Sequence, residues 1–155
     1  MKVGFIGCGN MAKAMIHGML GSKKVQPQEM IASAKSEKTR EAISSQIGIR
    51  AAKTNTEVLE FADIVFLAVK PQYLEAVLTE IRGAVRPSQV FVSLAPGKTL
   101  DWLSQRLGSE TKLIRTMPNT PAMVGAGMTA LLFLESGKDM NAEITIPASL
   151  TQEFK

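Results

Sequence analysis

Small residues follow the first apolar segment of the chain in the pattern Gly7-x-Gly9-x-x-Ala12. The segment before them, Val3 to Ile6, is predicted to be a strand, and Met11 to Leu20 has helical spacing. In such a unit the first glycine permits a tight turn, the second lets backbone approach a ligand, and the small third residue lets helix pack on strand. Free N–H groups at the start of the helix attract phosphate.

The pattern therefore predicts a loop that binds the pyrophosphate of a dinucleotide. Its residues are Gly7, Cys8, Gly9, Asn10, Met11 and Ala12. The alternative is a strand-to-helix turn without a ligand, which the further strands behind the loop disfavour.

Two reactive side chains near this loop are interpreted as structural. Cys8 is expected to fill space rather than to act in redox chemistry. His17 lies on a helical stretch that should pack against the sheet, so a structural role is favoured over a catalytic one. One Cys and one His in the whole chain argue against internal disulfides and against a zinc site, so no metal is expected.

The second predicted strand, Met30 to Ser33, points to the choice of cofactor. An NAD-binding site of this kind usually has Asp or Glu at the end of its second strand, to hold the ribose 2′-OH. Here Ser33 stands there, Lys35 follows, and the first carboxylate is Glu37. Hydroxyl and ammonium groups suit a 2′-phosphate, so NADP(H) is expected to be preferred, with NAD(H) possible. Alternatively, Lys35, Lys38 and Arg40 are only the solvated face of a helix.

Strands and helices are predicted to alternate along the rest of the chain. The further strands are Ile49–Ala52, Asp63–Val69, Val90–Leu94 and Lys112–Met117, with a seventh apolar run at Met128–Leu134. The further helices are Ser36–Gln46, a short one capped by Thr54 and Glu57, Tyr73–Arg82 and Thr99–Leu107, and Gly21 is expected to cap the first helix. The continuous β-branched run at 63–69 is typical of a strand covered on both faces. The predicted class is α/β, a Rossmann-type, doubly wound, mainly parallel sheet with helices on both faces.

Length and composition suit one such domain. The chain has 155 residues, 45% of them hydrophobic, which is enough for one core. The net charge of +4 is too small and scattered for a nucleic-acid interface. No apolar run could span a membrane and no signal-peptide layout is present, so a cytoplasmic protein without membrane partners is expected. Residues 1–134 are assigned to the dinucleotide-binding domain and 135–155 to a tail or the truncated start of a helical domain.

Four segments together resemble the amino-terminal domain of pyrroline-5-carboxylate reductase. They are residues 3–12, 62–71, 93–99 and 115–122, in the family's order and spacing. The first is shared with many dinucleotide enzymes, whereas the last, which contains Met117-Pro118-Asn119-Thr120-Pro121, is much more specific. The departure is at the carboxyl end, because members of that family continue with a helical domain that forms the dimer and completes the substrate pocket.

The resemblance implies reduction of 1-pyrroline-5-carboxylate to proline with NAD(P)H, in a homo-oligomer at full length. Beyond the glycine loop, it implies cofactor contacts at Ser33, Lys35, Asn55, Ala68, Val69, Lys70, Pro71, Ala95, Gly97 and Asn119. Asn119 and Thr120 are the candidates for holding nicotinamide or substrate. No general acid is identified, and none is needed if the imine arrives protonated. We expect the isolated chain to bind NADP(H) and to turn over poorly; the alternatives are a non-catalytic NADP-binding module or another Rossmann reductase, such as one that uses deazaflavin and NADP.

Overall fold

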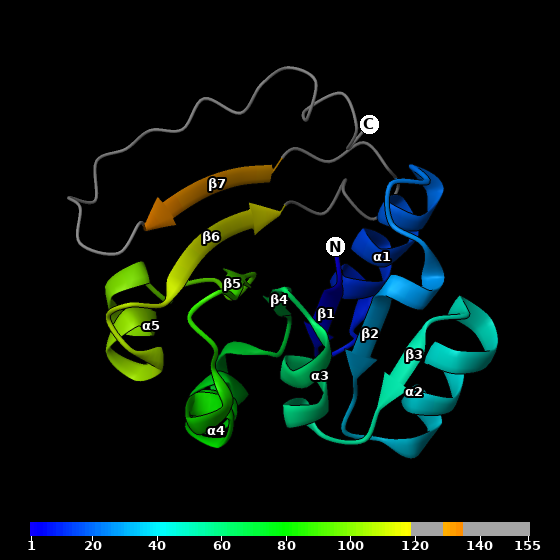
Figure 1. Cartoon of the computed structure of the whole chain (residues 1–155), viewed down its shortest axis with the longest axis horizontal. Coiled ribbons are helices and arrows are strands. Elements are labelled where there is room, and N and C mark those ends of the chain that lie inside the picture. Colours follow the sequence, from blue (N-terminus) through cyan, green and yellow to red (C-terminus); the bar gives the residue numbers. More distant parts are fainter. Residues whose placement is uncertain (119–128, 135–155) are drawn as a thin grey trace.

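The computed structural model describes residues 1–118 and 129–134, and the side chains of residues 1–116. Its strands form one sheet in the order β3-β2-β1-β4-β5-β6-β7 (Figure 1). The strands are β1 Val3–Ile6, β2 Met30–Ser33, β3 Arg50–Ala52, β4 Ile64–Leu67, β5 Val90–Ser93, β6 Lys112–Pro118 and β7 Thr129–Leu134. Strands β1 to β6 run parallel, and β7 pairs antiparallel with β6.

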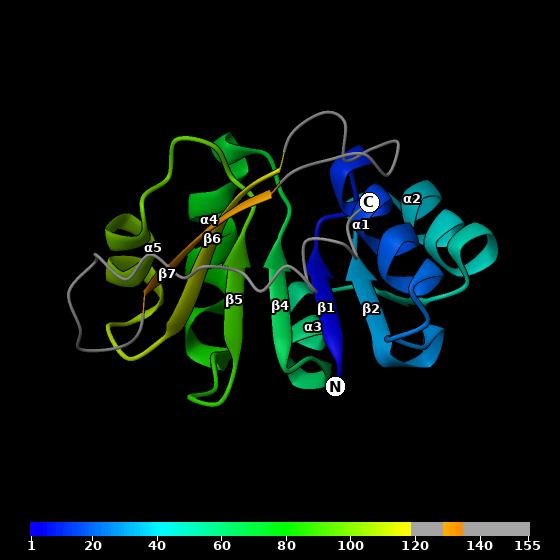
Figure 2. The ribbon, with the colours of Figure 1, turned by 90° about the horizontal axis from the view of Figure 1, so that it is seen from above.

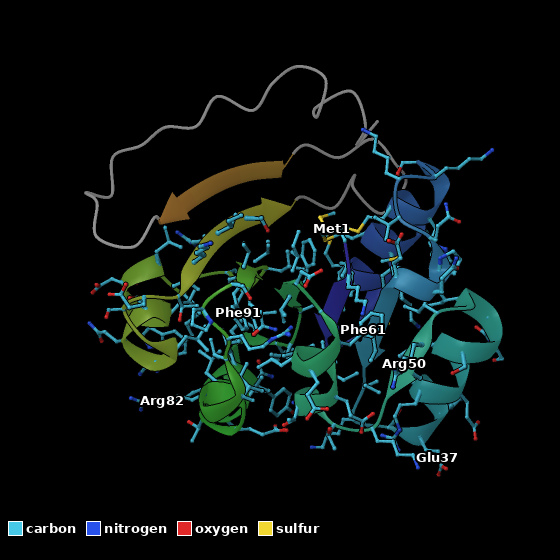
Figure 3. The ribbon with its side chains drawn as sticks, viewed as in Figure 1. Met1, Glu37, Arg50, Phe61, Arg82 and Phe91 are labelled. Carbon is cyan, nitrogen blue, oxygen red and sulfur yellow. The ribbon has the colours of Figure 1, made fainter. Side chains whose placement is uncertain are left out.

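Helices cover both faces of this sheet (Figure 2). The α-helices are α1 Asn10–Gly21, α2 Glu37–Ala42, α3 Asn55–Phe61, α4 Pro71–Ile81 and α5 Leu100–Leu107, and short turns of helix lie at Pro27–Glu29, Ile43–Ile47 and Arg82–Ala84. On one face, Ile16 of α1 and Ile43 pack with Phe5 and Phe66 of the sheet. On the other face, α3, α4 and α5 bury apolar side chains against the sheet around Phe91, which Figure 3 shows in the interior. The fold class predicted from the sequence is confirmed.

The sheet reverses its direction of winding at β1. The chain passes from β1 through α1 to β2 on one side, and from β3 through α3 to β4 on the other. The loops after β1 and β4 therefore diverge at the carboxyl ends of neighbouring strands, which is where ligands bind in such sheets. The part of the chain that the structure describes has no helix of the length and apolarity needed to cross a bilayer.

The predicted strands and helices are confirmed to within one to three residues at most ends, with local differences. Gly21 does not cap the first helix, since Ser22 N–H still donates to the Gly18 carbonyl and the left-handed residue is Lys23, with φ of 60°. Thr54 does cap α3, accepting from Glu57 N–H at 3.2 Å. The Glu57 carboxylate, however, reaches the Lys53 amide at 3.4 Å rather than that of Thr54.

Candidate functional site

Gly7 directly follows β1 and has a backbone conformation that residues with a side chain avoid. Its φ is 93°, and a Cβ built there would lie 2.8 Å from the carbonyl oxygen of Ala68 and 3.0 Å from Val69 Cγ1. The backbones that follow β1 and β4 therefore pass each other here with no room for a side chain. Since an L-residue is strained at this φ, both local and tertiary constraints require glycine.

Gly9, by contrast, faces open space. It is the N-cap of α1, with φ of −79° and ψ of −172°, and a Cβ would meet nothing within 4 Å. No side chain caps this helix and its first turn has no acidic residue. The first N–H groups of a helix have no intrahelical acceptor, and the helix dipole makes this end positive. The open space, free amides and lack of a competing carboxylate fit the pyrophosphate of a dinucleotide.

The residues inside the loop divide by exposure. Asn10 is exposed and Met11 half-buried, whereas Cys8 and Ala12 are buried against the sheet. Burial raises the pKa of the Cys8 thiol, and the charge of Lys13 opposes this only in part. A buried thiol with a raised pKa is a poor nucleophile. The interpretation of Cys8 as a space-filling residue is therefore supported.

The expectation that His17 packs against the sheet is wrong. Ala12 and Ile16 are the residues that α1 buries, and His17 is exposed. Successive residues of a helix are about 100° apart, so the position after the buried Ile16 turns away from the sheet. The sequence does not reveal that His17 is exposed, because apolar residues surround it and Met15 and Met19 also pack beside the buried face.

A chain of hydrogen bonds links the loop to the end of β2 and the start of α3. Ser33 is 4% exposed, and its hydroxyl donates to Asn55 Oδ1 at 2.6 Å. The Ser33 hydroxyl oxygen also accepts a long hydrogen bond from Gly7 N–H at 3.4 Å. Asn55 Nδ2 in turn donates to Glu80 Oε2, on α4, at 3.0 Å. Two predicted cofactor residues, Ser33 and Asn55, are thus in direct contact beside Gly7.

The basic side chains after β2 have different roles. Arg40 donates from Nη1 to the carbonyls of Ala34 and Lys35, at 2.9 and 3.0 Å, so it fixes the loop. Lys35 is exposed, and its Nζ lies 5.6 Å from the ring centroid of Tyr73, on α4. The Lys35 ammonium group therefore lies between the end of β2 and α4, where it is accessible to a ligand. Lys38 is exposed on α2, as the alternative of a solvated helix face requires.

The remaining predicted contacts follow β4 and β5 at the same edge of the sheet. Ala68, Val69 and Lys70 lead directly from β4 into α4, with Pro71 as its first residue. After β5, Ala95 is buried and Gly97 turns with φ of 75°. Strand β6 ends at this edge with Pro118. Asn119 and Thr120 lie outside the described residues.

Two residues near these contacts were not predicted from the sequence. Glu80 reaches Asn55 from a helix that is 25 positions away, and Tyr73 is 53% exposed beside Lys35. Tyr73 could have been noticed as an aromatic residue just after the predicted Lys70-Pro71 contact. Glu80 gives no such signal, because an exposed glutamate on a helix is ordinary in any sequence.

Comparison with known proteins finds pyrroline-5-carboxylate reductases both among the curated relatives and among the similar structures. The chain is 46% identical over 130 residues to pyrroline-5-carboxylate reductase of Escherichia coli, an alignment that covers 84% of the chain and 48% of that relative. The structure of a pyrroline-5-carboxylate reductase from Coxiella burnetii superposes with a TM-score of 0.83 at 27% identity, over 99% of this chain and 54% of that one. The NADP-bound structure of Plasmodium falciparum pyrroline carboxylate reductase gives 0.77 at 27% identity, with coverage of 99% and 54%.

The chain spans about half the length of the curated relatives that it matches. A family model described as NADP oxidoreductase, coenzyme F420-dependent, matches residues 2–97. That range contains β1 to β5 with the glycine loop, Ser33, Asn55 and the segment after β4. Because the match covers more than half of the chain, the chain belongs to the NADP oxidoreductase, coenzyme F420-dependent, family.

Proposed function

We propose that this chain binds NADP(H) and provides the cofactor-binding part of an enzyme that reduces 1-pyrroline-5-carboxylate to L-proline. The observation that carries the proposal is the open, uncapped start of α1 behind Gly7 and Gly9, adjoining the Ser33–Asn55 pair. The 46% identity to the Escherichia coli reductase supports the choice of substrate.

Each part of the site has a task in this proposal. The first amides of α1 bind the pyrophosphate, and Ser33 and Lys35 adjoin the 2′ position of the adenosine ribose. The segments after β4 and β5 lie along the edge where the rest of the cofactor extends. NADPH supplies a hydride when bound, and an imine nitrogen that is already protonated needs no acid from the protein. The chain then contributes binding and orientation, which lower the entropic cost of the reaction.

Replacing Lys35 by glutamate should shift the cofactor preference toward NADH. The exposed ammonium group would give way to a carboxylate, which repels a 2′-phosphate and can accept from a ribose hydroxyl. We expect the ratio of the NADH to the NADPH dissociation constants to fall about tenfold, measured by calorimetry at low salt. Lys38→Glu, on the exposed face of α2, is the matched control and should move the ratio by less than about twofold. An equal shift in both variants would show only a general effect of charge.

The activity is tested by following NADPH oxidation with 1-pyrroline-5-carboxylate, with and without the carboxyl-terminal domain of the Escherichia coli reductase supplied in trans. We expect the chain alone to bind NADPH with little turnover, and turnover to appear when the second domain is added. Proline formation by the chain alone, at the rate of a full-length reductase, would contradict its assignment as a cofactor half. Tight NADPH binding without turnover in either case would favour a non-catalytic module.

The family description favours a second candidate, hydride exchange between coenzyme F420 and NADP. The matched range, residues 2–97, ends before the Met117–Pro121 segment on which the resemblance to the proline enzyme depends most. An assay of the same protein preparation with reduced F420 and NADP⁺ distinguishes this candidate from imine reduction. Turnover with this pair, and none with the imine, would favour the second candidate.

The wider assignments belong to the same proposal. We propose residues 1–134 as the dinucleotide-binding domain, and residues 135–155 as a tail or the start of a helical domain. We also propose a cytoplasmic, homo-oligomeric whole protein without membrane or nucleic-acid partners. Size-exclusion chromatography of a chain joined to a relative's carboxyl-terminal domain tests the oligomeric state directly.

A further inference from the structure

The hydrogen bonds between Glu80, Asn55 and Ser33 have a fixed direction. A carboxylate only accepts, so Glu80 must face the amide nitrogen of Asn55, as it does at 3.0 Å. The amide oxygen of Asn55 is therefore the atom that faces Ser33, at 2.6 Å. Because an amide oxygen only accepts, the Ser33 hydroxyl must donate to it. The orientation of one buried hydroxyl is thus set by an exposed carboxylate on α4.

This direction matters for what Ser33 can bind. A serine hydroxyl has one proton, and here Asn55 receives it. Ser33 therefore presents only lone pairs elsewhere, one of them already used by Gly7 N–H. A ribose 2′-hydroxyl can donate to such an oxygen, whereas an ionised 2′-phosphate has only acceptors. At this position the hydrogen bonds favour the 2′-hydroxyl, opposite to the effect of Lys35.

We propose that Glu80 is a positioning residue that, through Asn55, orients the Ser33 hydroxyl as an acceptor and so reduces the preference of this site for NADPH over NADH. The inference rests on the proposed binding of NADP(H). This role of Glu80 explains how a serine can stand at the end of β2 while the site still accepts NADH as well as NADPH. The preference between NADPH and NADH is then a balance between two effects. Lys35 favours the 2′-phosphate, whereas the hydrogen bonds that Glu80 and Asn55 accept leave Ser33 an acceptor and so favour the 2′-hydroxyl.

The test is the variant Glu80→Gln, with NADPH and NADH dissociation constants measured by calorimetry. A glutamine amide can donate or accept, so Asn55 is free to turn and the Ser33 proton becomes available to a phosphate oxygen. We expect the ratio of the NADH to the NADPH dissociation constants to rise about three- to tenfold. Glu80→Ala, which also releases Asn55, should shift the ratio in the same direction.

Removing a negative charge could favour phosphate without any hydrogen-bond effect, so the measurement is repeated in a Ser33→Ala background. If Glu80 acts through the serine hydroxyl, Glu80→Gln leaves the ratio unchanged there. A shift that persists without the hydroxyl would overturn the proposal, as would an unchanged ratio in Glu80→Gln itself. Glu60→Gln removes the same charge from neighbouring α3 and should have no effect. If the unmodified chain binds neither cofactor, the proposed function fails; if it binds both and the ratio stays fixed, only the role of Glu80 fails.

Discussion

Replacing Gly9 by aspartate should remove most of the NADPH affinity of this chain while leaving its thermal stability equal or slightly higher. Gly9 has the extended backbone of an N-cap, and a side chain there would enter open space. Aspartate is among the best N-cap residues, since its carboxylate accepts from the first amides of the helix and complements the dipole. Those same amides are the ones that we propose to bind the pyrophosphate. We expect an affinity loss of about a hundredfold or more, which is about 2.7 kcal/mol.

The matched control is Gly9→Asn, which has the same shape and caps the helix without the charge. It should also weaken NADPH binding, but by less than aspartate, because it blocks the amides without repelling phosphate. Calorimetry gives the affinities, and thermal unfolding followed by circular dichroism shows that the fold is kept. If Gly9→Asp bound NADPH within about threefold of the unmodified chain, the pyrophosphate could not lie at the start of α1.

The parts of this fold that depend on neighbouring residues could be predicted from the sequence. The unit from β1 through the glycine loop to α1 is confirmed because an apolar run, two glycines and a helical spacing act within 20 positions. The capping of α3 by Thr54 is equally local. For the same reason the order of strands and helices is confirmed throughout the described residues.

The parts that depend on tertiary contacts could not be predicted in this way. The sequence predicts both Ser33 and Asn55 at the site, but the hydrogen bond between them joins residues 22 positions apart, and Glu80 is 25 positions further on. The sequence places Arg40 only in the alternative of a solvated helix face, whereas in the structure its guanidinium donates to backbone carbonyls of the loop before it. No pattern in the sequence states which acceptor a polar side chain will reach once the chain is folded.

Gly4 shows the same limit inside a strand. The sequence marks it only as a glycine in an apolar run, where it weakens the expectation of a strand. In the structure a Cβ at Gly4 would lie 2.5 Å from Val58 Cγ1 and 2.8 Å from the Cβ of Ala62. Helix α3 therefore packs directly on the backbone of β1. This close contact belongs to the pairing of one helix with one strand, which only the fold reveals.

Replacing Gly7 by alanine should cost about 2–4 kcal/mol in the free energy of unfolding, more than an alanine at any other position of the loop. A φ of 93° is strained for any residue with a Cβ, and the new Cβ would lie 2.8 Å from the Ala68 carbonyl oxygen. That oxygen belongs to backbone, so it cannot turn aside as a flexible side chain could. Relief requires the loop after β4 to move away from β1, which also disturbs the edge where we propose that the cofactor binds. Urea unfolding, followed by circular dichroism, measures the effect.

Gly48 supplies the control that separates the two causes. It also has a left-handed backbone, with φ of 79°, but a Cβ there would meet nothing within 4 Å. Gly48→Ala should therefore lose only the backbone preference, about 1 kcal/mol. The difference between the variants measures how tightly the backbone at Gly7 packs against the segment after β4. If both alanines destabilised the chain equally, the close contact with Ala68 would not be what requires a glycine after β1. The local backbone preference alone would then explain Gly7.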